Sequence, residues 1–131
     1  MCGNGNCDCL RDVLCTIVKL QKQGQCIDSG IESCDRPYLG INSNSAYNTR
    51  PITFYTCPNN RLWQMPYTLN GTAGNSTVFR VEAVEDCCCT CRVLAPGEED
   101  GTYQSTDSFF TINLNCVGAL QCLNDTYIAC I

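Results

Sequence analysis

Near the start of the chain, apolar residues recur every three or four positions, and this spacing predicts an α-helix over residues 9–23. The apolar face of that helix is formed by Leu10, Val13, Leu14, Ile17 and Val18. Asp8 can cap the first turn, and Gly24 follows the last turn. The preceding residues are mostly Gly, Asn and Cys and have little to bury, so residues 1–9 are expected to form a flexible cysteine-rich arm.

Beyond Pro51 the hydrophobic period changes to two, which is typical of half-buried β-strands. This pattern predicts strands at residues 52–56, 62–69, 77–85 and 87–93, whereas residues 26–50 read as irregular. Pro66 suits an edge strand, and Asn70-Gly71 predicts a tight hairpin turn. The inward positions expected in the last two strands are Phe79, Val81, Ala83, Cys87, Cys89, Cys91 and Val93.

The final apolar run covers residues 110–122 and predicts one more strand, interrupted at Gly118 by a bulge or bend. Its inward parity is Phe110, Ile112, Leu114, Cys116, Leu120 and Cys122. The expected core combines Phe79, Val81, Phe110, Ile112 and Leu114 with Val13, Leu14 and Ile17 of the helix. The predicted fold is therefore mainly β: an antiparallel β-sandwich of five to seven strands with one N-terminal α-helix, a single domain over residues 10–131.

The amino-acid composition excludes several classes of function. The chain has 131 residues, 14 of them cysteine, and no histidine, which excludes Ser-His-Asp and Cys-His catalytic sites and metal sites that need imidazole. We expect that the protein is not an enzyme and that it has no catalytic residue and no cofactor. A net charge of −5 opposes nucleic-acid binding, and no apolar run reaches the length of a membrane span. Charged residues make up only 16% of the chain, which favours close packing with neighbouring molecules.

The cysteines allow three interpretations: metal binding, redox chemistry or disulfide formation. Structural zinc sites usually need two close cysteine pairs, but the chain has a single CxxC, at Cys88 to Cys91, so no metal ligand is assigned. That CxxC lies in a predicted strand rather than at a helix start, which disfavours redox catalysis. A cysteine-rich module that binds zinc or copper remains the alternative to a structural role. Buried thiols that merely fill the core are a further interpretation for Cys89, Cys91 and Cys116.

The positions of the cysteines suggest two groups. Those on the polar arm, on the outward parity of a strand or at the end of the chain are candidate crosslinks between subunits: Cys2, Cys7, Cys9, Cys88 and Cys130. Those on inward parities are candidate intradomain disulfides or core thiols: Cys89, Cys91, Cys116 and Cys122. The start of the chain shows no secretory signal, so a cytosolic origin conflicts with this many cysteines unless the protein later meets an oxidising exterior.

Two blocks of the sequence resemble the CotY/CotZ spore-coat family of endospore-forming bacteria, which includes the exosporium protein ExsY. The first block is Phe79-Arg80-Val81-Glu82, then Asp86-Cys87-Cys88, Thr90 and Leu94-x-Pro96. The second is Cys116-Val117-Gly118-Ala119-Leu120-Gln121-Cys122-Leu123, and Cys7-x-Cys9 before the helix is similar to the start of that family. The resemblance spans about residues 7–123; the chain departs from it by lacking a polar tail and by carrying the additional Cys89, Cys91 and Cys130.

The resemblance implies a structural protein of the outer coat or exosporium that assembles with itself, as a lattice or a filament, and with other spore-coat proteins. Members of the family are made in the mother-cell cytosol during sporulation and crosslinked by disulfides once the cell lyses. This sequence of events explains how a protein made in the cytosol, without a signal peptide, can still form disulfides. It also implies partners of the same kind, neither nucleic acid nor membrane.

Overall fold

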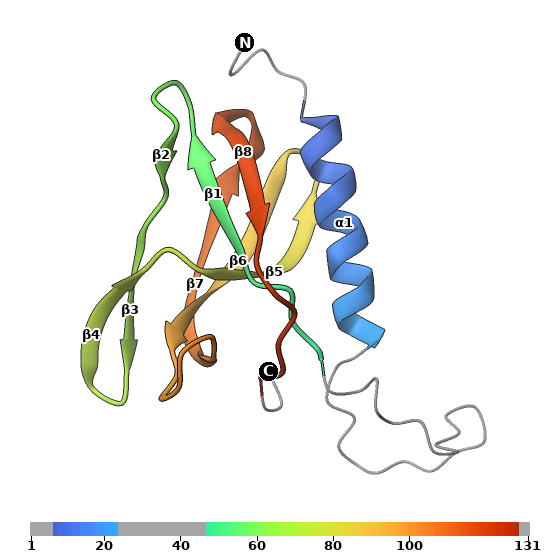
Figure 1. The fold of residues 1–131 in the computed structure, drawn as a ribbon. Helices are drawn as coiled ribbons and strands as arrows, with labels where there is room; N and C mark the ends of the chain where they lie inside the picture. The colour runs from blue at the N-terminus through green and yellow to red at the C-terminus, as the bar shows by residue number, and fades with distance from the viewer. Residues whose placement is uncertain (1–6, 24–46, 129–131) are drawn as a thin grey trace, which may run out of the picture.

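The fold is seen in a computed structural model, which describes residues 7–23 and 47–128 (Figure 1). The predicted helix is α1 (Asp8–Gln23), and it packs along β5. Leu14, Ile17 and Gln21 are buried on its inner side. Val13 was expected in the core but is 42% exposed, because it lies at the margin of the stripe that faces the sheet.

Eight strands follow within residues 47–128, and all their pairings are antiparallel. They are β1 (Ile52–Thr56), β2 (Arg61–Leu62), β3 (Met65–Leu69), β4 (Thr72–Ser76), β5 (Phe79–Glu85), β6 (Cys88–Pro96), β7 (Tyr103–Asn113) and β8 (Val117–Cys122). The larger sheet has the order β2-β1-β5-β6-β7, with β8 also paired to β1. The mainly β fold with antiparallel sheets and an N-terminal helix is thus confirmed.

The smaller sheet is the hairpin β3-β4, which contacts β6 and β7 of the larger sheet. Its turn is Asn70-Gly71, as predicted, and both residues take left-handed conformations with φ of 53° and 80°. The single strand expected over 62–69 is in fact β2 and β3, separated by Trp63 and Gln64. Trp63, Met65 and Tyr67 pack against the core between the layers.

Three aromatic rings mark the centre of the core. The Phe54 and Phe79 rings stack at 6.0 Å, and Phe110 meets Phe79 edge-on at 4.7 Å. Val81, Ile112 and Leu114 are buried around them, as the strand periodicity predicted. Burying these apolar side chains away from water stabilises the fold.

Two irregularities change the inward parity that the sequence suggested. The pairing of β5 with β6 slips between Val81 and Ala83, so Ala83 is exposed and Val84 turns toward the core. In β8, Thr56 pairs with Val117 and Tyr55 with Ala119, which leaves Gly118 as the extra residue of a bulge. The bulge expected at Gly118 is confirmed.

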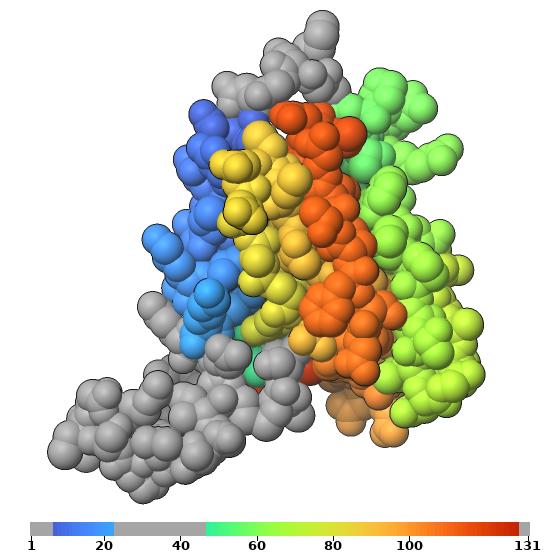
Figure 2. All heavy atoms as spheres, turned by 180° about the vertical axis from the view of Figure 1, so that it is seen from behind, coloured from blue at the N-terminus to red at the C-terminus, as the bar shows by residue number. Residues whose placement is uncertain are grey.

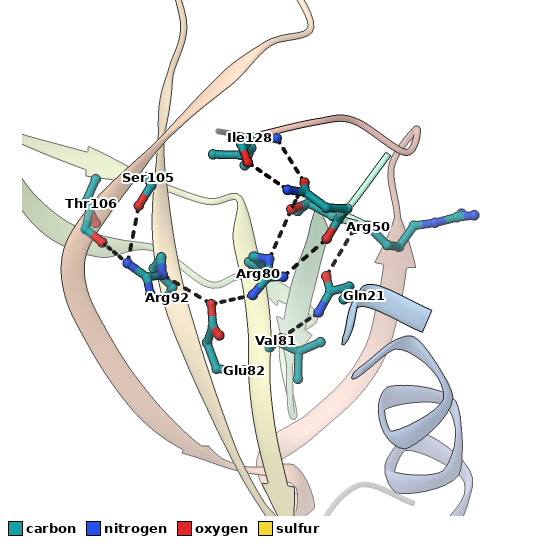
Figure 3. A network of polar contacts seen from close by, with 11 residues as sticks. Gln21, Arg50, Arg80, Val81, Glu82, Arg92, Ser105, Thr106 and Ile128 are labelled. Atoms are coloured by element: carbon teal, nitrogen blue, oxygen red, sulfur yellow. Dashed lines mark hydrogen bonds and ion pairs between the residues drawn. The ribbon is translucent and has the colours of Figure 1, made fainter. Parts of the chain in front are cut away.

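A polar network joins the helix and both ends of the described segment 47–128 to β5 (Figure 3). Arg80, only 5% exposed, donates to the Thr49 hydroxyl and the Asn48 carbonyl and pairs with Glu82 at 2.8 Å. Gln21 donates to the Val81 carbonyl and accepts from the Arg50 amide. The amide group of Asn48 bonds both backbone groups of Ile128. These contacts hold the segments 47–50 and 126–128 against the sheet.

Candidate functional site

Several elements begin or turn at one end of the molecule (Figure 1), and the sequence gives each of them a cysteine. These elements are the start of α1, the β1-β2 connection, the β5-β6 turn and the short 3-10 helix η2 (Leu114–Cys116) between β7 and β8. Backbone hydrogen bonds tie the elements together: Leu114 donates to the Cys87 carbonyl and Cys57 to the Cys116 carbonyl. We call this end the cysteine pole; its members are Cys7, Cys9, Cys57, Cys87, Cys88 and Cys116.

Within the pole, a disulfide links Cys7 and Cys87, whose Cα atoms lie 5.9 Å apart. We call the side of the pole that carries this disulfide its inner side. The disulfide joins the residue before α1 to the β5-β6 turn across 80 residues of sequence. The expectation that Cys7 crosslinks subunits is therefore wrong: Cys7 is 3% exposed, and its sulfur is bonded within the chain. The helix packs along β5, and this brings its N-terminus to the turn that holds Cys87. Residues 7–9, assigned to the arm, thus belong to the folded domain.

Cys57 is disulfide-bonded as well, whereas the outer side of the pole carries free thiols. Cys9 lies in the first turn of α1, Cys88 begins β6 and Cys116 ends η2, and all three are exposed. Cys9 and Cys88 are exposed, as the sequence suggested, although Cys9 lies in α1 and not on a flexible arm. Cys116 was expected in the core, but η2 interrupts the period of two and turns it outward. Exposed thiols of this kind can react with another molecule.

Cys122 is also a free, exposed thiol, although the sequence made it a candidate for an intradomain disulfide or a core thiol. The extra residue at Gly118 brings Val117 onto the inward face. Cys122 keeps the parity of Leu120 and pairs with the buried Ile52, so it is exposed because of the space beside it and not because its strand face has changed. It borders a mostly apolar cavity of about 340 Å³ beside α1, together with Val13, Leu20 and Tyr47. Cys15 is half-buried and free.

Cys89 and Cys91 are fully buried on the inner face of β6, and their Sγ atoms lie 3.5 Å apart. The hydrogen bond with Cys89 and burial away from water raise the pKa of Cys91 well above its ordinary value. A thiol in this state is a poor nucleophile, because only the thiolate reacts. These two cysteines contribute to packing in the core.

Other predicted positions lie outside the described residues: Cys2 and Cys130. Within residues 7–23 and 47–128, no group of three or more Cys, Asp or Glu side chains is arranged to hold a metal ion. In the same part of the chain, no helix is long and apolar enough to cross a membrane.

Sequence reasoning missed the partner of Cys7. The inward parity of Cys87 was visible, but nothing in the sequence relates it to a cysteine 80 residues away. It also missed the Arg80–Glu82–Arg92 network, in which Glu82 Oε2 lies 2.8 Å from Arg80 and 3.1 Å from Arg92. The alternation suggested only that Arg80 and Glu82 share a face.

The model of a family described as spore coat protein Z matches residues 3–107, which include α1 and β1 to β6. No curated protein and no solved structure matches the chain.

Proposed function

Because this chain belongs to the CotZ spore-coat family, we propose that it assembles with itself into an ordered array or fibre whose subunits are crosslinked by disulfides. The family gives it a structural role in the spore coat, at the surface of the spore. We place it more narrowly in the outer coat or exosporium. In this proposal the chain is not an enzyme.

The observation that carries the proposal is the contrast between the two sides of the cysteine pole. On the inner side, Cys7 and Cys87 already form a bond that stabilises the domain. On the outer side, Cys9, Cys88 and Cys116 are exposed and free, and the core does not use them. Cysteines that neither pack nor pair within a subunit are available to its neighbours.

The covalent step is an oxidation of two thiols. One Sγ from each subunit loses its proton, a single S–S bond forms, and two electrons pass to an oxidant such as dioxygen or a small disulfide. The reaction is favoured outside a reducing cytosol. Assembly would therefore become covalent after the mother cell lyses, which agrees with the spore-surface location. Cys2 and Cys130 remain predicted crosslinks, and other spore-coat proteins remain predicted partners.

The test combines a variant of the pole with isotope mixing. The full-length protein and a variant with Cys9, Cys88 and Cys116 changed to Ser are each prepared in labelled and unlabelled forms, mixed, oxidised and digested without reduction. Disulfide-linked peptides with one labelled half report bonds between subunits. We expect such peptides to contain pole cysteines in the parent protein and to be much less abundant in the variant. Cys122→Ser, an exposed thiol away from the pole, is the matched control.

If every disulfide joins two halves with the same label, the crosslinking proposal is wrong. If Cys122→Ser lowers crosslinking as much as the triple change, the pole has no special role. Elemental analysis of the purified protein addresses the alternative function, because a zinc or copper module would carry metal in a stoichiometric amount.

A further inference from the structure

The hairpin β3-β4 has one strand edge that the described chain leaves open. β4 pairs with β3, and in the part of the chain that the structure describes it pairs with no other strand. The hairpin (yellow-green) lies on the side of the molecule away from α1 in both views (Figures 1 and 2). An open edge presents backbone N–H and C=O groups to solvent and can add a strand from another molecule.

The two-residue turn determines which groups of β4 face outward. Leu69 and Thr72 flank the turn, so they form a hydrogen-bonded pair, and bonded and non-bonded pairs then alternate along the hairpin. Tyr67 and Gly74 are therefore bonded to each other. Ala73 and Asn75 belong to non-bonded pairs, and their N–H and C=O groups point away from β3. Both residues are exposed.

The edge of β4 lacks the features that usually protect an open strand. Such edges are normally blocked by charge or by proline. No residue from Leu62 to Phe79 is charged, although the chain as a whole carries a net charge of −5. β3 contains Pro66, whereas β4 contains no proline. A second copy can thus approach this edge without the like-charge repulsion that it meets elsewhere.

Contacts within a single copy already fix the conformation of β4. A Cβ atom at Gly74 would lie 2.7 Å from the Tyr67 hydroxyl oxygen, so the Tyr67 ring covers the glycine directly. An aromatic ring placed across from a strand glycine supports the strand there. At the other end of β4, Ser76 donates to the Leu94 carbonyl at 2.7 Å. Little conformational freedom of β4 remains to be lost on binding.

We propose that the open edge of β4 pairs with β4 of a second copy, antiparallel and about a two-fold axis near Gly74. In this arrangement Ala73 of each copy lies opposite Asn75 of the other, and the outward N–H and C=O groups of both satisfy one another. The contact is self-complementary, as a two-fold interface requires. The inference deepens the proposed self-assembly, but it uses no cysteine and so can be tested without crosslinking.

The first experiment measures association by sedimentation velocity over a range of concentrations. The full-length protein is treated with iodoacetamide and without reductant, which blocks free thiols and keeps the existing disulfides. We expect this protein to associate reversibly. Ala73→Pro removes an outward N–H, and Asn75→Lys adds a charge to the edge; each should weaken association about tenfold, roughly the effect of losing one hydrogen-bonded pair. Circular dichroism checks that each variant is folded.

Thr68→Lys is the matched control. Thr68 is exposed on the same face of the hairpin, directly across from Ala73 but on β3, and the change in charge is the same. Association should stay close to that of the parent protein. If Thr68→Lys weakens it as much as Asn75→Lys, the face of the hairpin rather than its edge is in contact, and the proposal is overturned.

Hydrogen exchange gives a second readout that does not depend on substitutions. The amides of Ala73 and Asn75 should gain protection as the concentration rises, while the amide of Gly74, already bonded within the hairpin, should not change. Exchange at Ala73 and Asn75 that is independent of concentration contradicts the proposal, as does alkylated protein that stays monomeric. Either result leaves disulfide crosslinking, measured on unblocked protein, to be judged separately.

Discussion

At the scale of single residues, the cysteines of this chain differ in chemistry because their surroundings differ. Cys88 and Cys89 are neighbours in β6, yet the first is exposed and the second fully buried. The alternation of a strand is enough to separate a thiol that can react from one that packs. Cys91, hydrogen-bonded to Cys89 and buried, has a raised pKa and remains protonated at neutral pH.

The raised pKa of Cys91 predicts a loss of stability at alkaline pH. Below pH 9 the thiol is protonated in both the folded and the unfolded chain, so it does not affect the pH dependence. Above about pH 9 the unfolded chain releases the proton while the folded chain keeps it, and unfolding becomes easier by up to about 1.4 kcal/mol per pH unit. Urea denaturation between about pH 8 and pH 10 measures this slope on protein alkylated in the folded state, in which the exposed thiols are blocked and the buried Cys91 thiol is not.

Cys91→Ala is the comparison for that slope. The variant is expected to be less stable at every pH, because a buried side chain is truncated, but its stability should fall less steeply above pH 9. Equal slopes would show that the Cys91 thiol titrates no differently in the folded and unfolded chains.

A second residue-scale feature is the shared carboxylate of Glu82. It pairs with Arg80, which is almost buried, and with Arg92, which also donates to the Thr106 carbonyl (Figure 3). The Arg92 guanidinium also lies over the Phe109 ring, 4.5 Å from its centre. Without Glu82, two guanidinium groups would face each other with no counter-charge. The carboxylate thus allows a buried arginine to join β5 to the segment 47–49.

At the scale of elements, the short helix η2 and the bulge at Gly118 decide which side chains of the last strands reach the core. Ile112 and Leu114 are buried before the interruption, and Val117 is buried after it. Asn113, between the first two, is exposed and caps η2 by accepting from the Asn115 amide. A strictly alternating strand would have placed Cys116 inward instead.

This arrangement predicts unequal effects of alanine at adjacent positions. Ile112→Ala should lower the free energy of unfolding by about 2–5 kcal/mol, because it leaves a cavity in the core. Asn113→Ala should cost no more than about 1 kcal/mol, the usual value of one capping interaction. Denaturant unfolding of the two alkylated variants provides the measurement. Similar losses at both positions would contradict the burial pattern of β7.

At the scale of the whole molecule, the two proposed contacts lie in different places. The cysteine pole gathers around the start of α1, whereas the hairpin β3-β4 lies on the side away from the helix (Figures 1 and 2). A two-fold contact at one place closes on itself and forms a pair. A second contact elsewhere can link such pairs, so repeated use of both would extend the assembly.

The net charge of −5 predicts that salt strengthens the reversible association of alkylated protein. Like charges on two copies repel each other. At physiological ionic strength the Debye length is about 8 Å, so repulsion between charges farther apart than this is largely screened. The uncharged hairpin itself should respond little. Light scattering at about 20 mM and about 300 mM sodium chloride should show larger particles at the higher concentration. Smaller particles at high salt would indicate that ion pairs hold the copies together.

The sequence alone determined those features that depend on neighbours along the chain. Spacings of three and four predict α1, alternation predicts the main strands and most of the core, and Asn70-Gly71 predicts the hairpin, because side-chain periodicity and turn geometry are local. The exposure of Cys88 and the burial of Cys89 and Cys91 follow from the same alternation. The two sequence blocks also carried the resemblance to the family to which the chain belongs.

Only the tertiary structure decided the rest. It joined Cys7 to Cys87 across 80 residues, turned Cys116 outward, left Cys122 exposed at a cavity beside α1, exposed Ala83 and left one edge of β4 open. Each of these depends on which distant segments pack together, or on one extra residue that shifts the parity of a strand against its partner. Local periodicity contains neither kind of information, because the shift is set by the pairing between strands and not by either strand alone.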